Sequence, residues 1–177
     1  MREALKTLIG EGLVTRSGPR AGYAVAQLTP SEYEELYIVC RALELAALVR
    51  ALDRAGDDDD ARLLAAHDAS ARALAAGDVM SYQHATKDFH FALTAPAAMP
   101  RLTSILEHTW HMTEPGQPMR HNDAERRARL QREHTAQVQA FLARDLAALV
   151  SATEDHYRTL FSVIGELPPS TGVFRDR

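Results

Sequence analysis

Three histidines of this chain lie among apolar residues at helical spacing, and each belongs to a different predicted helix. The three are His90, His134 and His156. The neighbours of His90 on the same helical face are Tyr82, Thr86, Phe89 and Leu93; those of His134 are Leu130, Val138 and Phe141; and those of His156 are Leu149, Thr153 and Leu160. Spacings of three or four residues point each ring toward the interior that these neighbours fill. Burying an imidazole without a partner costs about 1–3 kcal/mol, so three buried rings require partners. The pattern therefore predicts a bundle in which three helices share one interior.

The composition is typical of one helical domain with a small appendage. The chain has 177 residues, of which 46% are hydrophobic and 25% charged, enough to build a core. The single cysteine, Cys40, excludes an internal disulfide framework and fits a reducing cytoplasm. No apolar run approaches the roughly 20 residues that a membrane span needs, and no signal peptide is visible, so we expect a cytoplasmic protein.

The charge is distributed unevenly along the chain. The net charge is −4, yet residues 1–28 carry four basic side chains against two acidic ones. A basic end on an acidic body is compatible with nucleic-acid contact at that end, through Arg2, Arg16 and Arg20. Four basic residues on an ordinary solvated surface are the alternative that charge alone leaves open.

The first 28 residues predict a short helix and a hairpin. Residues 1–14 form an amphipathic pattern that Gly10 and Gly12 end. Two β-prone runs, residues 13–16 and 23–26, flank a turn rich in Gly and Pro, which is typical of a hairpin. Arg16 would project from a strand and Arg20 from the tip.

The rest of the chain predicts an antiparallel bundle of six helices. Thr29, Pro30 and Glu32 form a capping box with proline at the first helical position. The expected helices are residues 29 to about 56, 57–76, 78 to about 95, 102–112, 122–143 and 146–164; residues 114–118 are the clearest loop. We expect three parts: 1–28, 29–166 as the bundle, and 167–177 as a disordered tail.

A divalent metal shared by the three histidines would partner all three rings at once. Neutral imidazole is a good ligand for zinc and other late divalent ions, nickel included, and three helices can leave coordination positions open for water or a ligand. The alternative is three separate core histidines, each bonded to a hydroxyl or a backbone group. Of the other histidines, we expect His67 and His121 to face solvent and His84 to lie on the surface.

We expect no enzymatic activity. No nucleophile motif, phosphate-binding glycine loop or cysteine pair is present. Glu133 and Glu154 are each close in sequence to one of the histidines, but adjacent helical residues face different ways, so neither is an obvious general base. A metal-dependent hydrolase or isomerase that uses the three histidines is the alternative, and a bundle that only dimerises, without binding DNA, is another.

Several fragments together resemble the GntR family of bacterial transcription regulators, in its FadR-like subgroup with an FCD effector-binding domain. The fragments are Arg2-Glu3-Ala4-Leu5, Leu8, Glu11 to Val14, Arg16 to Val25, Leu28-Thr29-Pro30, Leu36-Tyr37, Leu43-Glu44, Phe89-His90, Glu133-His134 and His156. The first resemble the end of a recognition helix and the wing of a winged helix-turn-helix, and the later ones the FCD bundle. The resemblance spans nearly the whole chain.

The resemblance implies a homodimer that binds operator DNA and a small metabolite, often a carboxylic acid. Many members hold a metal through an aspartate and three histidines, which correspond to His90, His134 and His156. The aspartate corresponds to Thr86, a weaker ligand.

The resemblance also implies an effector pocket inside the bundle. The family's arginine in the first bundle helix corresponds to Cys40, with Arg41 beside it, and His108 and His111, which flank Trp110, are further candidates to line the pocket. The chain starts inside the recognition helix, so we expect this polypeptide alone to bind DNA weakly or not at all.

Overall fold

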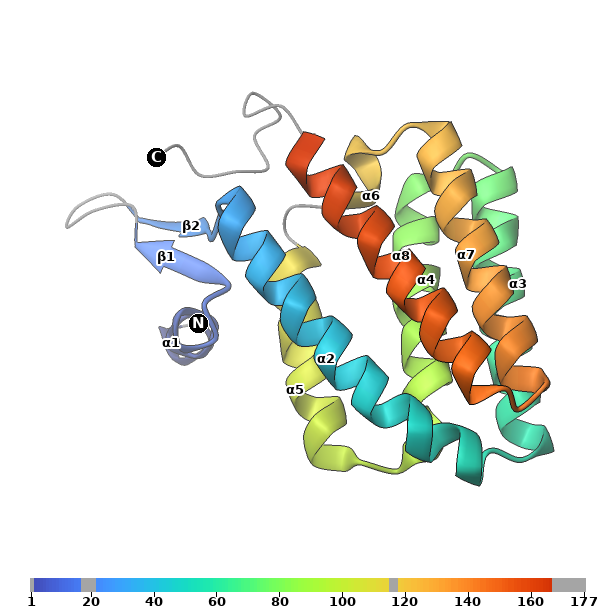
Figure 1. The fold of residues 1–177 in the computed structure, drawn as a ribbon. Coiled ribbons are helices and arrows are strands. Elements are labelled where there is room, and N and C mark those ends of the chain that lie inside the picture. Colours follow the sequence, from blue (N-terminus) through green and yellow to red (C-terminus); the bar gives the residue numbers. More distant parts are fainter. Residues whose placement is uncertain (1, 17–21, 115–117, 167–177) are drawn as a thin grey trace.

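The first part of the structure is a short helix followed by a hairpin (Figure 1). The computed structural model describes residues 2–16, 22–114 and 118–166. Helix α1 spans Arg2–Gly10, and strands β1 (Val14–Arg16) and β2 (Tyr23–Val25) pair antiparallel. The paired residues are Val14 with Val25, Thr15 with Ala24 and Arg16 with Tyr23. The predicted helix and hairpin are confirmed, whereas the predicted tip, with Arg20, lies outside the described residues.

Six long helices form the rest of the described chain, which confirms the predicted all-α, antiparallel bundle (Figure 1). They are α2 (Pro30–Arg54), α3 (Asp57–Ala75), α4 (Val79–Thr94), α5 (Pro100–Thr113), α7 (Ala124–Leu142) and α8 (Leu146–Glu166). Helix α2 packs between α5 and α8, while α7 packs between α3 and α8, and α4 contacts α2, α3 and α5. No described helix has both the length and the apolar character needed to span a membrane.

Helix starts are fixed by side chains that accept backbone N–H groups. Thr29 accepts from the N–H of Glu32, whose carboxylate accepts in return from the N–H of Thr29 at 2.6 Å, so the predicted capping box is present. Asp78 caps α4 and Asp123 caps α7 in the same way. These caps satisfy backbone N–H groups that have no partner within the helix, and so they fix where each helix begins.

Two short elements differ from the expected chain path. A 3₁₀ helix, η1 (Ala95–Ala97), fills the break that the prolines predict, and Ala98 leaves it with a left-handed φ of 48°. A four-residue helix, α6 (Pro118–His121), begins at the last residue of the predicted loop. Proline suits the first position of a helix, which is why α6 starts there rather than continuing the loop.

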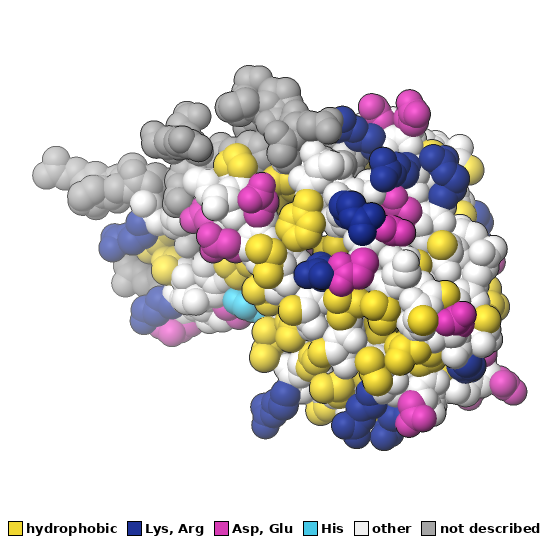
Figure 2. Space-filling model, viewed as in Figure 1, with side chains coloured by type: hydrophobic (Ala, Val, Ile, Leu, Met, Phe, Trp, Pro, Cys, Tyr) yellow, Lys and Arg dark blue, Asp and Glu magenta, His cyan; other side chains and the backbone are white. Residues whose placement is uncertain are grey.

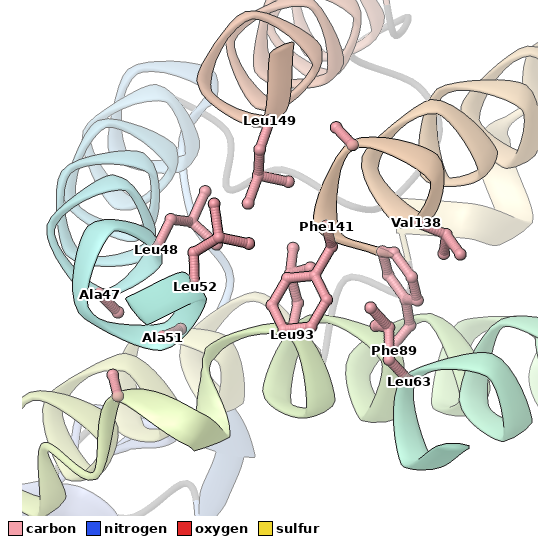
Figure 3. Packing of buried hydrophobic residues seen from close by; sticks show 12 residues of the cluster. Ala47, Leu48, Ala51, Leu52, Leu63, Phe89, Leu93, Val138, Phe141 and Leu149 are labelled. Atoms are coloured by element: carbon pink, nitrogen blue, oxygen red, sulfur yellow. The ribbon is translucent and has the colours of Figure 1, made fainter. Parts of the chain in front are cut away.

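The bundle core consists of two clusters of buried hydrophobic side chains. One joins α2, α3, α4, α7 and α8, and its labelled side chains point toward one another in Figure 3. It includes Leu48, Leu63, Leu93, Phe141 and Leu149, all fully buried. The second cluster is rich in tyrosine and includes Tyr33, Tyr82 and Tyr157. The three buried histidines lie between these apolar surroundings, since His134 stacks on Phe89 of the first cluster and His156 contacts Tyr157 of the second.

Candidate metal centre

The structure brings the three predicted histidines together inside the bundle. His90 comes from α4, His134 from α7 and His156 from α8, and each is at most 1% exposed. The ring centroids are 4.6 Å apart for His134 and His156, 5.1 Å for His90 and His156, and 5.2 Å for His90 and His134. One nitrogen from each ring lies within 4.8 Å of the others. Three helices therefore present three imidazole nitrogens to one point.

Packing and one hydrogen bond set the register of α7 against α8 at this point. Gln137, three residues after His134, donates to the hydroxyl of Thr153, three residues before His156, at 3.0 Å. On α4, Phe89 packs its ring 4.5 Å from that of His134. Because these contacts are fully buried, they hold the histidine rings in place whatever occupies the space between them.

Two carboxylates orient two of the rings. Glu44 of α2 is fully buried, and its Oε2 lies 3.1 Å from Nδ1 of His90. Glu133 of α7 places its Oε2 3.3 Å from Nδ1 of His156 and accepts the hydroxyl hydrogen of Thr159 at 2.7 Å. A carboxylate accepts, so Nδ1 carries the hydrogen in both rings and Nε2 is left as the free lone pair. Carboxylates behind metal-ligating histidines commonly fix the ring tautomer in this manner.

The rings at the centre fit a metal because their nitrogens lack other partners. Among the described residues, both nitrogens of His134 and Nε2 of His156 are buried without a hydrogen bond. Leaving such atoms unsatisfied costs about 1–3 kcal/mol each. Burial, reinforced by the other rings, holds the pKa of His134 well below its usual value, and burial also lowers the pKa of His156 despite its bond to Glu133. Both rings are therefore neutral, the form that binds a metal.

The electrostatics of Glu133 complement those of the rings. Partial burial raises the pKa of this carboxyl, but hydrogen bonds from His156 and Thr159 outweigh burial, and the pKa falls below its usual range. Arg129 adds a third donor at 3.1 Å. The carboxylate thus stays charged behind His156 and increases the basicity of that ring.

The fourth position differs from the pattern of the resembling family. Thr86 lies on α4 one turn before His90, is buried, and lines the cavity next to the histidines. A hydroxyl there is a poorer ligand than a carboxylate. Asp88, the nearest acidic residue in sequence, is exposed on the other side of α4.

A narrow cavity with a volume of about 30 Å³ adjoins the three histidines. Its lining residues are Tyr37, Cys40, Tyr82, Gln83, Thr86, Lys87, His90, Trp110, Thr113, Glu114, Met119, Leu130, His134, His156, Tyr157 and Leu160. The walls are thus mostly aromatic and aliphatic. Burial raises the pKa of Tyr82 to about 12 and that of Tyr157 well above its usual value, so these phenols are neutral.

Of the four residues predicted for the effector pocket, Cys40 lines the cavity and the other three do not. Arg41 turns outward and forms two hydrogen bonds to Glu154 of α8, at 2.8 and 2.5 Å. His108 is exposed and His111 half-buried. Successive residues of a helix are rotated by about 100°, so with Trp110 facing the cavity its neighbours at either side face elsewhere.

The other histidines correct one expectation and support another. His67, expected to face solvent, is 16% exposed and bonds to the hydroxyl of Thr135 at 3.0 Å across the α3–α7 contact. His121, also expected to face solvent, is half-buried, and His84 is exposed as predicted. His67 lies on the α3 face that carries buried Leu63 and Ser70, which explains its burial.

Sequence reasoning missed both carboxylates behind the rings. Glu44 lies four residues after Cys40 and four before Leu48, on the buried face of α2, and an acidic residue at such a position signals a buried partner. Glu133 gave no such signal, because it reaches α8 from the edge of the buried face of α7.

Of the three predicted DNA contacts, the structure describes the side chain of Arg16. Arg16 is exposed on β1, with its guanidinium 6.0 Å from the centre of the Tyr23 ring. Arg2 belongs to α1, but its side chain lies outside the description, as does the whole of Arg20.

Comparison with known families gives one match, to the FCD domain, over residues 35–159. That span contains all three histidines, Glu44, Glu133 and most of the cavity lining. No curated protein matches the chain significantly.

Solved structures of regulators share the fold. McbR/YncC of E. coli has 18% sequence identity and a TM-score of 0.85, covering 94% of this chain and 83% of that one. A GntR transcriptional regulator from Rhodococcus sp. RHA1 has 22% identity and a TM-score of 0.77, covering 94% and 80%. A GntR family member from Pseudomonas syringae pv. tomato has 19% identity and a TM-score of 0.62, covering 92% and 67%.

Proposed function

Because this chain belongs to the FCD domain family of GntR-type transcriptional regulators, which are not enzymes, we propose that it senses a small effector through a bound divalent metal. The observation that carries the proposal is the convergence of three buried histidines, of which His134 and His156 turn nitrogens without a hydrogen-bond partner in the described chain toward the others. His90, His134 and His156 are the proposed ligands.

The chemistry of the donor set favours zinc or nickel. Three neutral imidazoles suit both ions, and the bound ion supplies a positive, electron-accepting centre. Glu44 and Glu133 orient two of the rings and place two negative charges behind them. Thr86 contributes at most a weak fourth ligand, which leaves a position for an oxygen donor from outside the protein.

We propose that the effector is a small carboxylic acid. Its carboxylate takes the place that an aspartate fills in other members of the family, beside Thr86. The cavity next to the histidines must widen to hold the rest of the molecule, because its volume is about 30 Å³. Differential affinity for two arrangements of the bundle then allows the effector to shift the regulator between states.

DNA binding and dimerisation complete the proposal. We propose that residues 1–28 are part of a winged DNA-binding unit, which contacts phosphates through Arg2, Arg16 and Arg20. We propose that residues 29–166 are the effector domain of a cytoplasmic homodimer. Support for a dimer comes from α2, where Ile38 and Val49 are 54% and 53% exposed. Figure 2 shows hydrophobic side chains gathered over this helix.

The first test replaces His134 with alanine. Wild-type protein loaded with zinc is expected to contain about one ion per chain, and His134→Ala much less. At free zinc 100-fold above Kd, binding stabilises the fold by about 2.7 kcal/mol, or about 5–11 °C in Tm for a chain of this size. The variant is expected to lose this zinc-dependent increase.

The control is His84→Ala, which removes an exposed histidine. It should keep both the zinc content and the zinc-dependent increase in Tm. If elemental analysis and melting are the same for His134→Ala as for the wild type, the histidines hold no metal and the proposal is wrong.

A further inference from the structure

The charged side chains among the described residues that line the cavity are paired with each other. No lysine or arginine among them is left to bind a second carboxylate of a ligand. Among the lining residues that the structure describes, Lys87 is the single lysine or arginine, and its Nζ lies 2.7 Å from Oε1 of Glu114, which lines the cavity too. Arg41 is held by Glu154 outside the cavity. Desolvating a carboxylate without a cationic partner costs several kcal/mol. The cavity therefore disfavours any ligand that carries a second carboxylate.

The metal centre, by contrast, has one place for a carboxylate. Thr86 stands where a metal-binding aspartate is expected, so the ligand set is short of one negatively charged oxygen donor. Glu44 and Glu133 are already committed to Nδ1 of His90 and His156. One carboxylate from an effector supplies the missing oxygen donor. A second carboxylate would find neither a metal position nor an unpaired cation among the described lining residues.

The remaining walls favour an aromatic body. Three tyrosines, Trp110 and the side chains of Met119, Leu130 and Leu160 line the cavity. Aromatic rings make edge-to-face and offset contacts with each other, which favour an aromatic ligand beyond the area that it buries. The Trp110 ring lies 5.2 Å from that of His90, so the aromatic wall reaches the metal centre.

Besides Thr86 and the histidines, two lining residues carry a buried polar atom without a partner in the described chain. Trp110 Nε1 is a buried donor and Gln83 Oε1 a buried acceptor, and both residues line the cavity. Such atoms lose their hydrogen bond to water and regain it only from a ligand. A hydroxyl on the effector satisfies both kinds of atom, because it accepts and donates.

We propose that the effector is a small aromatic monocarboxylic acid bearing an uncharged hydroxyl, selected by Trp110 and Gln83 and by the Lys87–Glu114 pair. The inference rests on the proposed metal-bound carboxylate and narrows it to one class of acid. The carboxylate completes the metal centre, the ring contacts the aromatic wall, and the hydroxyl meets Trp110 and Gln83.

The test measures binding of matched acids to the zinc-loaded protein by calorimetry. The probes are benzoate, 3-hydroxybenzoate, 4-hydroxybenzoate, isophthalate, terephthalate and succinate. At least one hydroxybenzoate is expected to bind at least tenfold more tightly than the dicarboxylate with the same ring substitution, and more tightly than benzoate. Equal or tighter binding of the dicarboxylates would overturn the inference.

Two variants assign the selectivity to named residues. Trp110→Phe keeps an aromatic ring but removes the donor, so it should abolish the preference for a hydroxybenzoate over benzoate. Glu114→Gln frees the charge of Lys87, so dicarboxylate binding should rise about tenfold while benzoate binding changes less than threefold. Combining Glu114→Gln with Lys87→Met should remove that gain. If neither variant changes the selectivity, these residues do not determine it.

Failure of the proposed function gives a different pattern. If the protein holds zinc but none of the acids binds, the carboxylic-acid effector is wrong and this inference falls with it. If the protein holds no zinc, the metal centre itself is wrong. If the dicarboxylates or benzoate bind as tightly as the hydroxybenzoates or more tightly, the proposed function stays intact and the narrower class is rejected.

Discussion

At the scale of single residues, Thr86 determines how strongly the proposed metal centre would hold its ion. A protein that supplied all its ligands would bind the ion tightly and leave little for an effector to add. With a hydroxyl at Thr86, the proposed metal centre has three strong ligands, the histidines, and one weak position, on a helix whose His90 is buried. The cost is metal affinity, and the gain is a coordination position that an effector can occupy.

Replacing Thr86 with aspartate tests this division. The carboxylate should raise zinc affinity at least tenfold, about 1.4 kcal/mol, because a charged oxygen replaces a hydroxyl. Binding of carboxylic acids should weaken, since the added side chain fills their position. Zinc affinity is measured by competition with a chelator and acid binding by calorimetry. Thr86→Ser, which keeps a hydroxyl, is the matched control, and weaker zinc binding by the aspartate variant would contradict the assignment.

At the scale of helices, the caps determine where each helix begins, and packing of the apolar stripe determines which residues reach the interior. The capping box at Thr29 fixes the start of α2, and from that start Cys40, Glu44 and Leu48 fall on the buried face. Helix α2 thereby delivers the carboxylate that orients His90. A cap at the end of the bundle thus contributes to the geometry of the metal centre.

Thr29→Ala should destabilise the protein by about 1 kcal/mol, because the N–H of Glu32 loses its acceptor. For a chain of this size the expected decrease in Tm is about 2–4 °C. Thr29→Ser keeps the accepting oxygen and should differ little from the wild type in a thermal melt. Equal melting of the alanine and serine variants would mean that the cap contributes nothing.

The cap of α4 predicts a pH dependence. Asp78 accepts from the backbone N–H and hydroxyl of Ser81, and these bonds lower its pKa in the folded state. A lowered pKa contributes stability that is fully present above the unfolded pKa of about 3.9 and is lost as the pH falls through the folded value. Asp78→Asn keeps a capping oxygen but does not titrate. Its Tm should therefore fall less than that of the wild type between pH 5 and 3, and parallel curves would contradict the assignment.

Helix positions were largely predictable, because capping and breaking residues act locally. Thr29 with Pro30, Gly56 and Gly77 mark helix ends within a few residues of where the structure has them. The short α6 was missed, since four residues carry no periodic pattern. The rotation of α5 was missed as well, because it depends on what packs against the helix and not on its own sequence.

At the scale of the whole molecule, the site residues that follow a local sequence pattern could be predicted, and those that depend on packing between helices could not. The three histidines share the helical stripe with apolar neighbours, so their convergence follows once the helices form a bundle. The pairing of Arg41 with Glu154, by contrast, joins residues 113 positions apart and depends on how α2 packs against α8. Charges at the edge of an interface carry no pattern in sequence that reveals their partner.

The N-terminal helix and hairpin contribute little to the stability of the bundle, and their removal provides the last prediction. Tyr23 and Val25 of β2 are 49% and 61% exposed, and a contact with the bundle occurs where Gly12 faces the side chain of Met112. Leu28, however, packs against the tyrosine-rich cluster, and Thr29 caps α2. A chain beginning with methionine before Gln27 should therefore fold, keep its helical circular dichroism and bind zinc within threefold of the full chain.

A second, longer deletion is the control for this prediction. Removing residues 1–31 takes away both Leu28 and the cap at Thr29, so it should lower Tm by several degrees more than the shorter deletion. If the bundle is stable without the N-terminal helix and hairpin, that N-terminal unit can move relative to the bundle while the bundle stays folded. A regulator whose effector domain controls DNA binding requires such a movement. If the shorter deletion unfolds the bundle or abolishes zinc binding, the hairpin is part of the sensor, and the division near residue 28 is wrong.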